Sequence, residues 1–187
     1  MTSAADRLAH ARSLWNWVGQ ERPDFAVPAQ PGQESVWDYP RPPRLASDGR
    51  EVIVRLGDRQ IARTRRALRV LETASPPTFY LPLEDVQVDL LIPAPGTSSC
   101  EWKGEARYWS VVTGVDAGQR FEAVAWSYDA PLSDFAALRG HIAFYPQRLA
   151  CTVDGAPVKP QPGRFYAGWI TPEVVGPFKG EPGSGGW

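Results

Sequence analysis

The chain has 187 residues, a formal net charge of −1 and 43% hydrophobic residues, values typical of one globular domain with extensions. It lacks a run of about 18 apolar residues, and the near-neutral charge gives no general attraction to nucleic acid or to a membrane surface. The two cysteines cannot make a disulfide framework, and the N-terminus shows no secretory pattern. We therefore expect a cytoplasmic protein with no membrane partner.

Residues 3–20 give the clearest helical pattern in the chain. Ser3 can cap the N-terminus, and Asp6 follows three residues later in the position of a capping box. Apolar side chains recur at helical spacing and form one stripe, which we expect to pack on the domain: Leu8, Ala11, Leu14, Trp15 and Val18. The helix is therefore predicted to run over the whole segment.

Three segments are expected along the chain, with most of the fold in the central one. Residues 1–48 combine the helix with a Pro-rich arm, which Trp37 and Tyr39 anchor to the body. Residues 49–154 form the core domain. Residues 155–187 are again rich in Gly and Pro, but they carry several aromatic residues, which a disordered tail would lack. This extension is therefore expected to lie on the core.

The core domain is predicted to be mainly β. Short runs rich in Val, Tyr, Trp and Phe alternate with Gly and Pro, a pattern typical of strands. Two such runs flank Gly57 and Asp58, which predicts a β-hairpin. Residues 65–72 and 132–139 are predicted as short helical turns.

Sequence motifs of standard catalytic and metal sites are absent. There is no GxxxxGK[ST] loop, no GxGxxG after a predicted strand, no HExxH and no GxSxG elbow. The only histidines are His10 and His141, and the cysteines form no cluster, so a structural zinc is not expected. We therefore predict no metal and no cofactor.

The stretch SSCEWKGEARYW, residues 98–109, holds a thiol, two carboxylates and a lysine. Gly104 permits a turn or bulge that would aim Lys103 away from a strand ladder. Partial burial there would lower the pKa of Lys103 and make it a base, a nucleophile or an anion clamp. Cys100 is then either a reactive thiolate or a small buried side chain, and Lys103 could instead pair with a glutamate on the surface.

An aromatic-Lys-Gly-Glu motif occurs twice, as WKGE at residues 102–105 and as FKGE at residues 178–181. All but one of the lysines in the chain lie in this motif. One interpretation is that both motifs hold an anionic group from two sides. The other is a pair of similar bulges without a shared function, and the sequence leaves both interpretations open.

Arginines are concentrated in one short run, comprising Arg55, Arg59, Arg63, Arg65, Arg66 and Arg69. If strand alternation places some of them on one face, they form an anion-attracting patch, with Arg65 as the candidate ligand-binding residue. The alternative is a solvated face without function. Because the whole chain is slightly acidic, nucleic acid is not expected as a partner.

Tyrosine and tryptophan are frequent in the predicted strands and suit the wall of a ligand pocket, because their polar tips need partners. The candidate wall residues are Tyr80, Trp102, Tyr108, Trp109, Trp126 and Tyr145. Glu72 directly precedes one of these strands. A carboxylate at the edge of such a pocket, with its pKa raised by burial, suits proton transfer. The predicted catalytic set is Lys103, Glu72 and Cys100, with Gly104 at the turn.

Several blocks of the sequence together resemble one bacterial family. They occur in order at residues 61–91, 100–111, 125–132 and 140–146: IARTRRALRVLETASPPTFYLPLEDVQVDLL, CEWKGEARYWSV, AWSYDAPL and GHIAFYP. On these blocks the chain is identified as a member of the domain-of-unknown-function family four hundred and twenty-seven, whose core pattern covers about residues 50–150.

The resemblance implies a β-tent, or Mss4-like, architecture, in which antiparallel sheets pack at an angle over a cavity. Metal-binding relatives of that architecture use paired CxxC motifs, whereas Cys100 and Cys151 stand alone here, so no zinc is carried over. The recurring blocks of the family correspond here to Cys100, Lys103 and Gly104, and to Glu72 and Thr73. The nucleotidyltransferase label that the family sometimes bears finds no two-metal carboxylate motif in this sequence.

Three functional hypotheses follow from the sequence. The first is a site in the β cavity that binds or transforms a small anionic molecule through Lys103 and Glu72. The second is an interaction module without chemistry, in which the arm and the extension cover a partner or a second copy of the chain in a homodimer. The third is nucleotide binding, or nucleotidyl transfer, through the arginine run. The sequence specifies neither the substrate nor the reaction.

Overall fold

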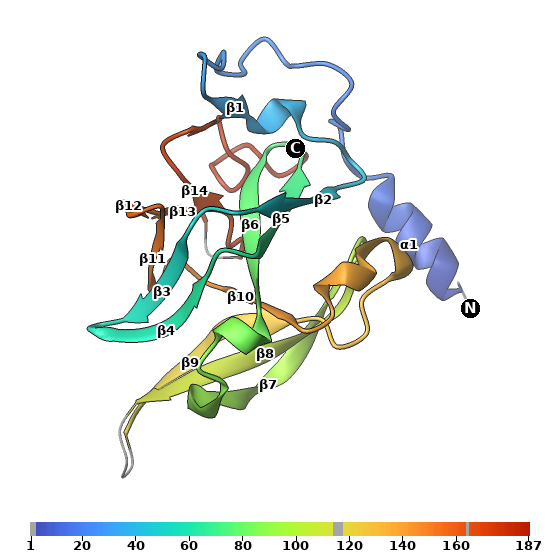
Figure 1. The fold of residues 1–187 in the computed structure, drawn as a ribbon. Coiled ribbons are helices and arrows are strands. Elements are labelled where there is room, and N and C mark those ends of the chain that lie inside the picture. The colour runs from blue at the N-terminus through green and yellow to red at the C-terminus, as the bar shows by residue number, and fades with distance from the viewer. Residues whose placement is uncertain (1–2, 114–117, 164) are drawn as a thin grey trace.

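The computed structural model describes residues 3–113, 118–163 and 165–187. Its fold is mainly β, as predicted, with two larger antiparallel sheets, two short strand pairs and an N-terminal helix (Figure 1). The main sheet has seven strands, in the spatial order β2 (Arg44–Asp48), β5 (Ala67–Glu72), β6 (Ser75–Pro82), β10 (His141–Phe144), β9 (Gln119–Ser127), β8 (Gly104–Thr113) and β7 (Leu91–Cys100).

The second sheet has four strands, in the order β12 (Ala156–Pro157), β11 (Ala150–Val153), β3 (Val52–Leu56) and β4 (Arg59–Thr64). Strands β3 and β4, at one edge of this sheet, run antiparallel from Val52 opposite Thr64 to Leu56 opposite Arg59. The predicted hairpin at Gly57 is therefore confirmed.

Two short strand pairs hold the terminal segments in place. The parallel pair of β1 (Glu34–Ser35) and β15 (Val174–Val175) joins the N-terminal arm to the C-terminal extension. The antiparallel pair of β13 (Lys159–Pro160) and β14 (Trp169–Ile170) lies within the extension, and β14 also contacts β6 of the main sheet.

Helix α1 (Ala4–Arg12) is shorter than predicted, although its start agrees with the prediction. The capping box is confirmed: the Asp6 backbone N–H donates to the Ser3 hydroxyl, and the Ser3 N–H donates to the Asp6 carboxylate, each at 3.0 Å. At the other end Ser13 donates through its backbone N–H to Ala9 and His10 carbonyls and closes the last turn.

The prediction of one continuous apolar stripe is wrong beyond Ser13, because tertiary contacts redirect the chain there. The Trp15 indole N–H donates to the Glu101 carboxylate at 3.1 Å, which pulls Trp15 onto the body of the protein. Leu14 is left 59% exposed. A helix continued to residue 20 would have kept both side chains on one face, but the contact with Glu101 requires them to separate.

The sequence pattern predicted a short helical turn at residues 65–72, and this prediction is wrong. The segment includes strand β5 instead. This strand pairs with β2 on one edge and with β6 on the other, so its backbone hydrogen bonds are made within the sheet. Val70 packs into one apolar cluster and Leu71 into another, so both faces of the strand are covered. Because both faces are covered, the strand lacks the polar alternation that would have revealed it.

The predicted helical turn at residues 132–139 is confirmed as the 3-10 helix η4 (Ser133–Leu138). Three further single turns are η1 (Val36–Asp38), η2 (Leu83–Asp85) and η3 (Val88–Leu90).

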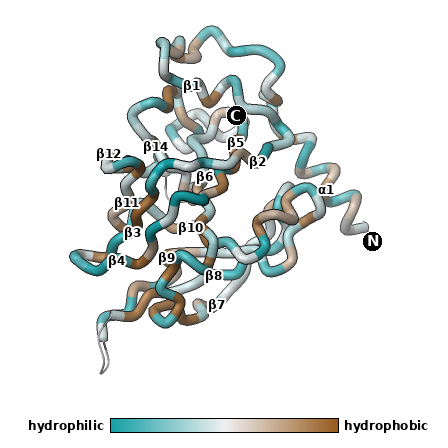
Figure 2. The backbone as a smooth tube through the Cα atoms, viewed as in Figure 1, coloured by the Kyte–Doolittle hydropathy of each residue, from teal (hydrophilic) through white to brown (hydrophobic). Residues whose placement is uncertain are grey.

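The main core lies between the two larger sheets and receives side chains from the extension. Trp169 is fully buried and stacks on Phe79, with the ring centroids 4.9 Å apart. Its indole N–H donates to the Phe144 carbonyl at 3.1 Å. Trp37 of the arm is also buried. Figure 2 shows the hydrophobic stretches concentrated around β3, β10 and β11, whereas the long arm before β1 is mostly hydrophilic.

Candidate functional site

A cavity of about 260 Å³ opens beside the main sheet, where the turn between β7 and β8 meets β5, β6 and both terminal segments. The structure brings most of the predicted site residues to its wall, namely Glu72, Tyr80, Cys100, Trp102, Lys103, Tyr108, Trp126 and Tyr145. They come from five different strands, the turn between β7 and β8, and the residue after β10, so the cavity exists only in the folded chain.

Three predicted site residues lie elsewhere. Trp109 follows Tyr108 on β8 and therefore points to the opposite face, where its indole N–H donates to Ser127 at 2.9 Å. Gly104 lies in the turn, beside Leu132, and contributes backbone geometry only. Arg65 has a 64% exposed side chain that pairs with Glu51 at 3.3 Å. Trp109 is excluded from the wall by strand alternation and Arg65 by its pairing with Glu51 elsewhere, whereas Gly104 has no side chain to place there.

Lys103 occupies the tight turn that links β7 to β8. Gly104 directly after it has a φ of 100°, a conformation that strongly favours glycine, so the residue type fixes the turn. The Lys103 carbonyl accepts a hydrogen bond from the Leu132 N–H at 3.1 Å, which ties the turn to the loop before η4. These two restraints hold the half-buried Lys103 side chain at the cavity.

The charge state of Lys103 differs from the sequence-based expectation. Burial by itself lowers the pKa of this ammonium group, as expected. The Cys100 thiol, the Tyr80 hydroxyl and the Glu72 carboxylate all act against burial, and together they raise the pKa above its ordinary value. Lys103 is therefore a permanent cation in the neutral pH range, suited to hold an anion.

A second lysine, Lys179, also lines the cavity, and it was not among the predicted site residues. It belongs to the second aromatic-Lys-Gly-Glu motif, so the repeat was the signal that could have revealed it. Gly180 has a φ of 110°, close to that of Gly104, and a Cβ atom there would lie 2.0 Å from the Pro162 carbonyl oxygen. The Lys179 N–H donates to the Ala74 carbonyl at 2.7 Å. Both motifs thus deliver a lysine to the same cavity.

The Lys179 side chain is almost fully enclosed, with 2% of the residue exposed. Its ammonium nitrogen donates to the Trp187 carbonyl at 2.5 Å and lies 3.4 Å from the centroid of the Trp15 ring. Burial, aided by the positive charge of Arg41, lowers the pKa of Lys179 to about 8, although Glu72 and Glu101 partly oppose the shift. The two lysines of the cavity are therefore shifted in opposite directions.

Glu72 is held at the cavity by a buried arginine. The Arg41 guanidinium donates to the Glu72 carboxylate at 3.2 Å, to the Thr73 carbonyl at 2.9 Å and to the Trp17 carbonyl at 2.6 Å. It also lies 4.7 Å from the Trp15 ring centroid. Arg41 thus compensates the charge of Glu72 and fixes the segment after α1 against the end of β5.

The cavity wall carries two lysines and two glutamates, and the positive charge of Arg41 lies beside it. Among residues 3–113, 118–163 and 165–187, neither Lys103 nor Lys179 pairs with an Asp or Glu side chain, and the Lys179 ammonium group donates to the main-chain oxygen of Trp187. Of the two carboxylates on the wall, Glu72 is paired with Arg41, and Glu101 accepts the hydrogen bond from Trp15. At least one lysine is therefore available to a negatively charged ligand.

Neutral hydroxyl groups complete the polar part of the wall. The Tyr108 hydroxyl donates to Ser98 at 2.7 Å, and the Trp126 indole N–H donates to the Tyr80 hydroxyl at 3.2 Å. Burial raises the pKa values of Tyr80, Tyr128 and Tyr145 above the ordinary tyrosine value. These hydroxyls therefore stay protonated and can donate to ligand oxygen atoms.

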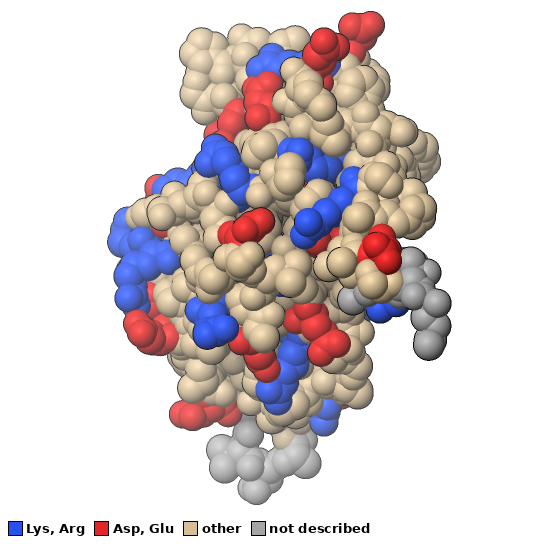
Figure 3. All heavy atoms as spheres, turned by 90° about the vertical axis from the view of Figure 1, so that its right-hand side faces the viewer, with Lys and Arg blue, Asp and Glu red and all other residues tan. Residues whose placement is uncertain are grey.

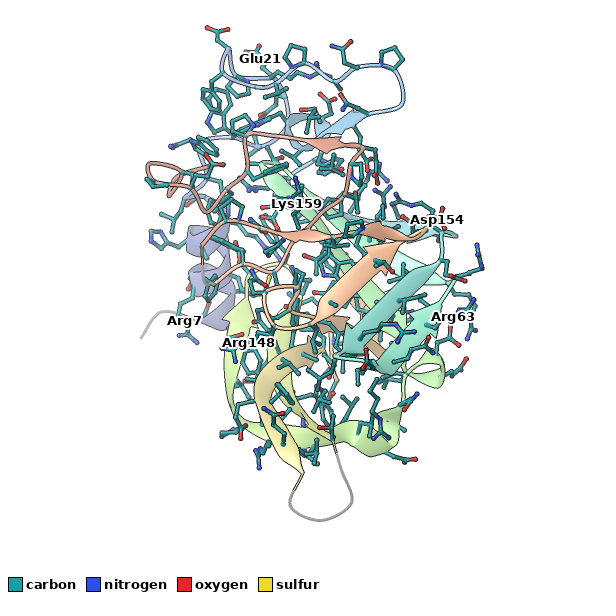
Figure 4. All side chains as sticks on the ribbon, turned by 90° about the vertical axis from the view of Figure 1, so that its left-hand side faces the viewer. Arg7, Glu21, Arg63, Arg148, Asp154 and Lys159 are labelled. Carbon is teal, nitrogen blue, oxygen red and sulfur yellow. The ribbon has the colours of Figure 1, made fainter. Side chains whose placement is uncertain are left out.

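The arginine run lies apart from the cavity and is largely neutralised. Glu51 pairs with Arg63 at 2.7 Å and with Arg65 at 3.3 Å, and Arg66 pairs with Glu84 and Asp85. Arg63 points away from the body at the edge of β4 (Figure 4). Figure 3 looks onto the side of the molecule that carries α1, where positive and negative side chains are interspersed.

The described ranges, which omit residues 1–2, 114–117 and 164, contain neither a metal-binding cluster nor a membrane-spanning helix. No group of three or more His, Cys, Asp or Glu side chains is arranged to hold a metal ion there. None of the described helices is both long enough and apolar enough to cross a bilayer.

A family model described as a domain of unknown function (DUF427) matches residues 44–155. The chain belongs to this family. The DUF427 match begins at the first residue of β2 and ends after β11, so it includes the whole main sheet. Among curated proteins, none matches the chain.

The cavity is built only partly by the DUF427 domain. That domain supplies Glu72, Cys100, Lys103 and the tyrosines of the strands. Trp15 comes from the segment before the match, and Lys179 comes from the segment after it. The terminal segments of this chain therefore close the cavity of the family domain and add its second lysine.

Proposed function

We propose that this protein binds a small anionic molecule in the cavity and that Lys103 is its principal charged contact. The observation that carries the proposal is the convergence of both aromatic-Lys-Gly-Glu motifs on one cavity, with neither lysine in a salt bridge among the described residues. The surroundings of Lys103 favour its ammonium form, so this side chain offers a fixed positive charge to an anionic ligand.

The wall also indicates the size and character of the ligand. A volume of about 260 Å³ holds a small metabolite rather than a polymer. Tyr80, Tyr108 and Trp126 offer both aromatic surface and hydrogen bonds, which suits a compact molecule with an anionic group and a flat or apolar part. If the site is catalytic, Glu72 moves a proton and Lys103 stabilises the developing negative charge.

Cys100 gives this proposal a second chemical group. It ends β7 directly before the turn, lines the cavity, and its thiol neighbours the Lys103 ammonium group. Its position on the cavity wall gives a small electrophile access to the sulfur. Cys100 is therefore the candidate nucleophile of the site, with Lys103 beside it.

Native mass spectrometry of the purified protein is the first test. We expect an additional mass that is lost on denaturation, and the identity of the released molecule would give the ligand class. In parallel, isothermal titration calorimetry with acetate, benzoate and inorganic phosphate tests anion binding directly. We expect Lys103→Ala to weaken the binding of any anion that the wild-type protein binds by about tenfold or more, since a charge-assisted hydrogen bond is lost.

The surface lysine Lys159 provides the matched control. Lys159→Ala removes the same charge from an exposed position and should leave anion binding unchanged. Lys103→Ala should also leave the melting temperature close to that of the wild type. A bare native mass together with no saturable anion binding at low salt would contradict the proposal, and a large loss of stability would assign Lys103 a structural role.

A further inference from the structure

The two cavity lysines have different surroundings, which suggests different chemical roles. Lys103 neighbours the Cys100 thiol, the Tyr80 hydroxyl and the Glu72 carboxylate, which together outweigh burial and favour its ammonium form. Lys179 faces the π-surface of Trp15 at 3.4 Å, with Tyr166 at 5.6 Å, and the charged groups that act on it are Arg41, Glu72 and Glu101. When two titratable groups of one site are shifted in opposite directions, each is suited to a separate task.

The surroundings of Lys179 are those of a nucleophilic amine. A lysine that is removed from water and placed near another cation loses its proton readily, and only the unprotonated amine has a lone pair for attack. With a pKa of about 8, close to half of the Lys179 side chains are unprotonated at a pH of about 8. Phe165, which is 75% exposed, also lines the cavity, so small molecules can reach it from the surface there.

We infer that Lys179 forms an imine with the aldehyde or keto group of a small anionic ligand, while Lys103 holds the negative charge of that ligand. This inference rests on the proposed function and names its substrate class as carbonyl-bearing anions, such as short oxo acids. It assigns a covalent role to a residue of the C-terminal extension, outside the DUF427 match.

The chemical step is balanced without an oxidant or a reductant. The lone pair of the Lys179 Nζ forms a bond to the carbonyl carbon, and the carbonyl oxygen takes up a proton to give a carbinolamine. Loss of that oxygen as water leaves the protonated imine. The net reaction combines one carbonyl group and one lysine ammonium group into one protonated imine and one water molecule. Glu72, held by Arg41 at 3.2 Å, is placed at the same cavity to transfer these protons.

The test traps the imine on the intact wild-type chain, so it does not depend on a variant that folds. The protein is incubated with glyoxylate, an anionic aldehyde, and sodium cyanoborohydride, which reduces an imine to a stable carboxymethyl-lysine. Peptide mapping then locates the adduct. Because the chain has only three lysines, Lys159 serves as the internal surface control. We expect Lys179 to be modified at least tenfold faster than Lys159, with a rate that rises through a pH of about 8.

A neutral aldehyde and an anion without a carbonyl group distinguish imine formation from anion binding. Propionaldehyde at the same concentration should show a smaller preference for Lys179, because Lys103 has no charge to hold. Calorimetry with glycolate, which has the carboxylate but no aldehyde, reports anion binding alone. If glycolate binds but glyoxylate modifies Lys159 as fast as Lys179, the imine is refuted and the anion site stands. If glycolate does not bind and glyoxylate does not modify Lys179 faster than Lys159, both proposals are refuted.

Discussion

The two aromatic-Lys-Gly-Glu motifs share a glycine with a positive φ but differ in their chemical environments. Residues 102–105 and 178–181 each place a lysine at the cavity, followed by a glycine with a φ of 100° or 110°. The pKa of Lys103 is nevertheless raised and that of Lys179 is lowered. The motif therefore provides a glycine with a positive φ after each lysine, whereas the spatial neighbours of each lysine set the direction of its pKa shift.

The largest expected difference between the motifs concerns their glycines. In Gly180→Ala the new methyl group would lie 2.0 Å from the Pro162 carbonyl oxygen, so we expect a loss of more than about 3 kcal/mol in the free energy of unfolding. In Gly104→Ala the nearest atom lies 3.5 Å away, so only the positive φ is unfavourable, at a cost of about 1–2 kcal/mol. Urea denaturation of both variants measures the contrast, and equal losses would show that backbone conformation alone decides it.

The second prediction is a difference in the pH dependence of stability. The folded-state pKa of Lys179, about 8, lies below the unfolded value of about 10.4, so the unfolded chain binds more protons in this window. Stability should therefore rise from pH 8 to pH 10, by on the order of 1–2 kcal/mol after allowance for solvent screening. Lys179→Met should remove this rise, as measured by chemical denaturation at several pH values.

For Lys103 the pH dependence of the free energy of unfolding has the opposite sign. Because its pKa is raised on folding, its contribution to stability is complete below about pH 10.4 and is lost only at higher pH. Lys103→Met should thus keep the rise between pH 8 and pH 10. If both variants lost the rise, the alkaline stabilisation would not belong to Lys179.

The two cysteines give a third and smaller contrast. Cys100 lines the cavity beside Lys103, whereas Cys151 is buried in β11, where burial raises the pKa of its thiol. We expect iodoacetamide to alkylate Cys100 at least about tenfold faster than Cys151, as followed by peptide mapping. Lys103→Ala should slow the alkylation of Cys100, because it removes the neighbouring cation. An unchanged rate in that variant would separate the thiol from the lysine.

The smallest effect is expected at the lysine outside the motifs. Lys159 lies on the short strand β13 and is exposed, so Lys159→Ala should change the free energy of unfolding by less than about 0.5 kcal/mol. The measurement sets the baseline for the two cavity lysines. A larger change would mean that loss of charge anywhere on the chain affects stability, and the comparison would have to be corrected for it.

Features with short sequence separation were accessible from the sequence. The capping box of Ser3 and Asp6, the hairpin at Gly57 and the turn before Gly104 each depend on residues within a few positions of one another. The resemblance to the family was carried by blocks in order along the chain, and it is confirmed by the match at residues 44–155. Residue type alone also singled out Lys103, Cys100 and Glu72, which the structure brings to the wall of one cavity.

Features that depend on long-range contacts were decided only by the tertiary structure. Strand β5 lacks a strand-like pattern because clusters from different parts of the chain cover both of its faces. Trp15 leaves the predicted helix to reach Glu101, and Trp109 turns away from the cavity that Tyr108 lines. The repeated motif was visible in the sequence, but its second lysine could be placed at the cavity only by the folded extension.

The sequence by itself determined which side chains were available and how the chain behaves over short stretches, because caps, turns and strand alternation arise from local sterics and hydrogen bonds. The tertiary structure decided which of those side chains share one cavity and what charge each one carries. The reason is that burial and electrostatic interactions depend on distance in space. Lys103 acquires its neighbours when β5, β6 and β7 come together, whereas Lys179 acquires its own when the terminal segments close over the sheet.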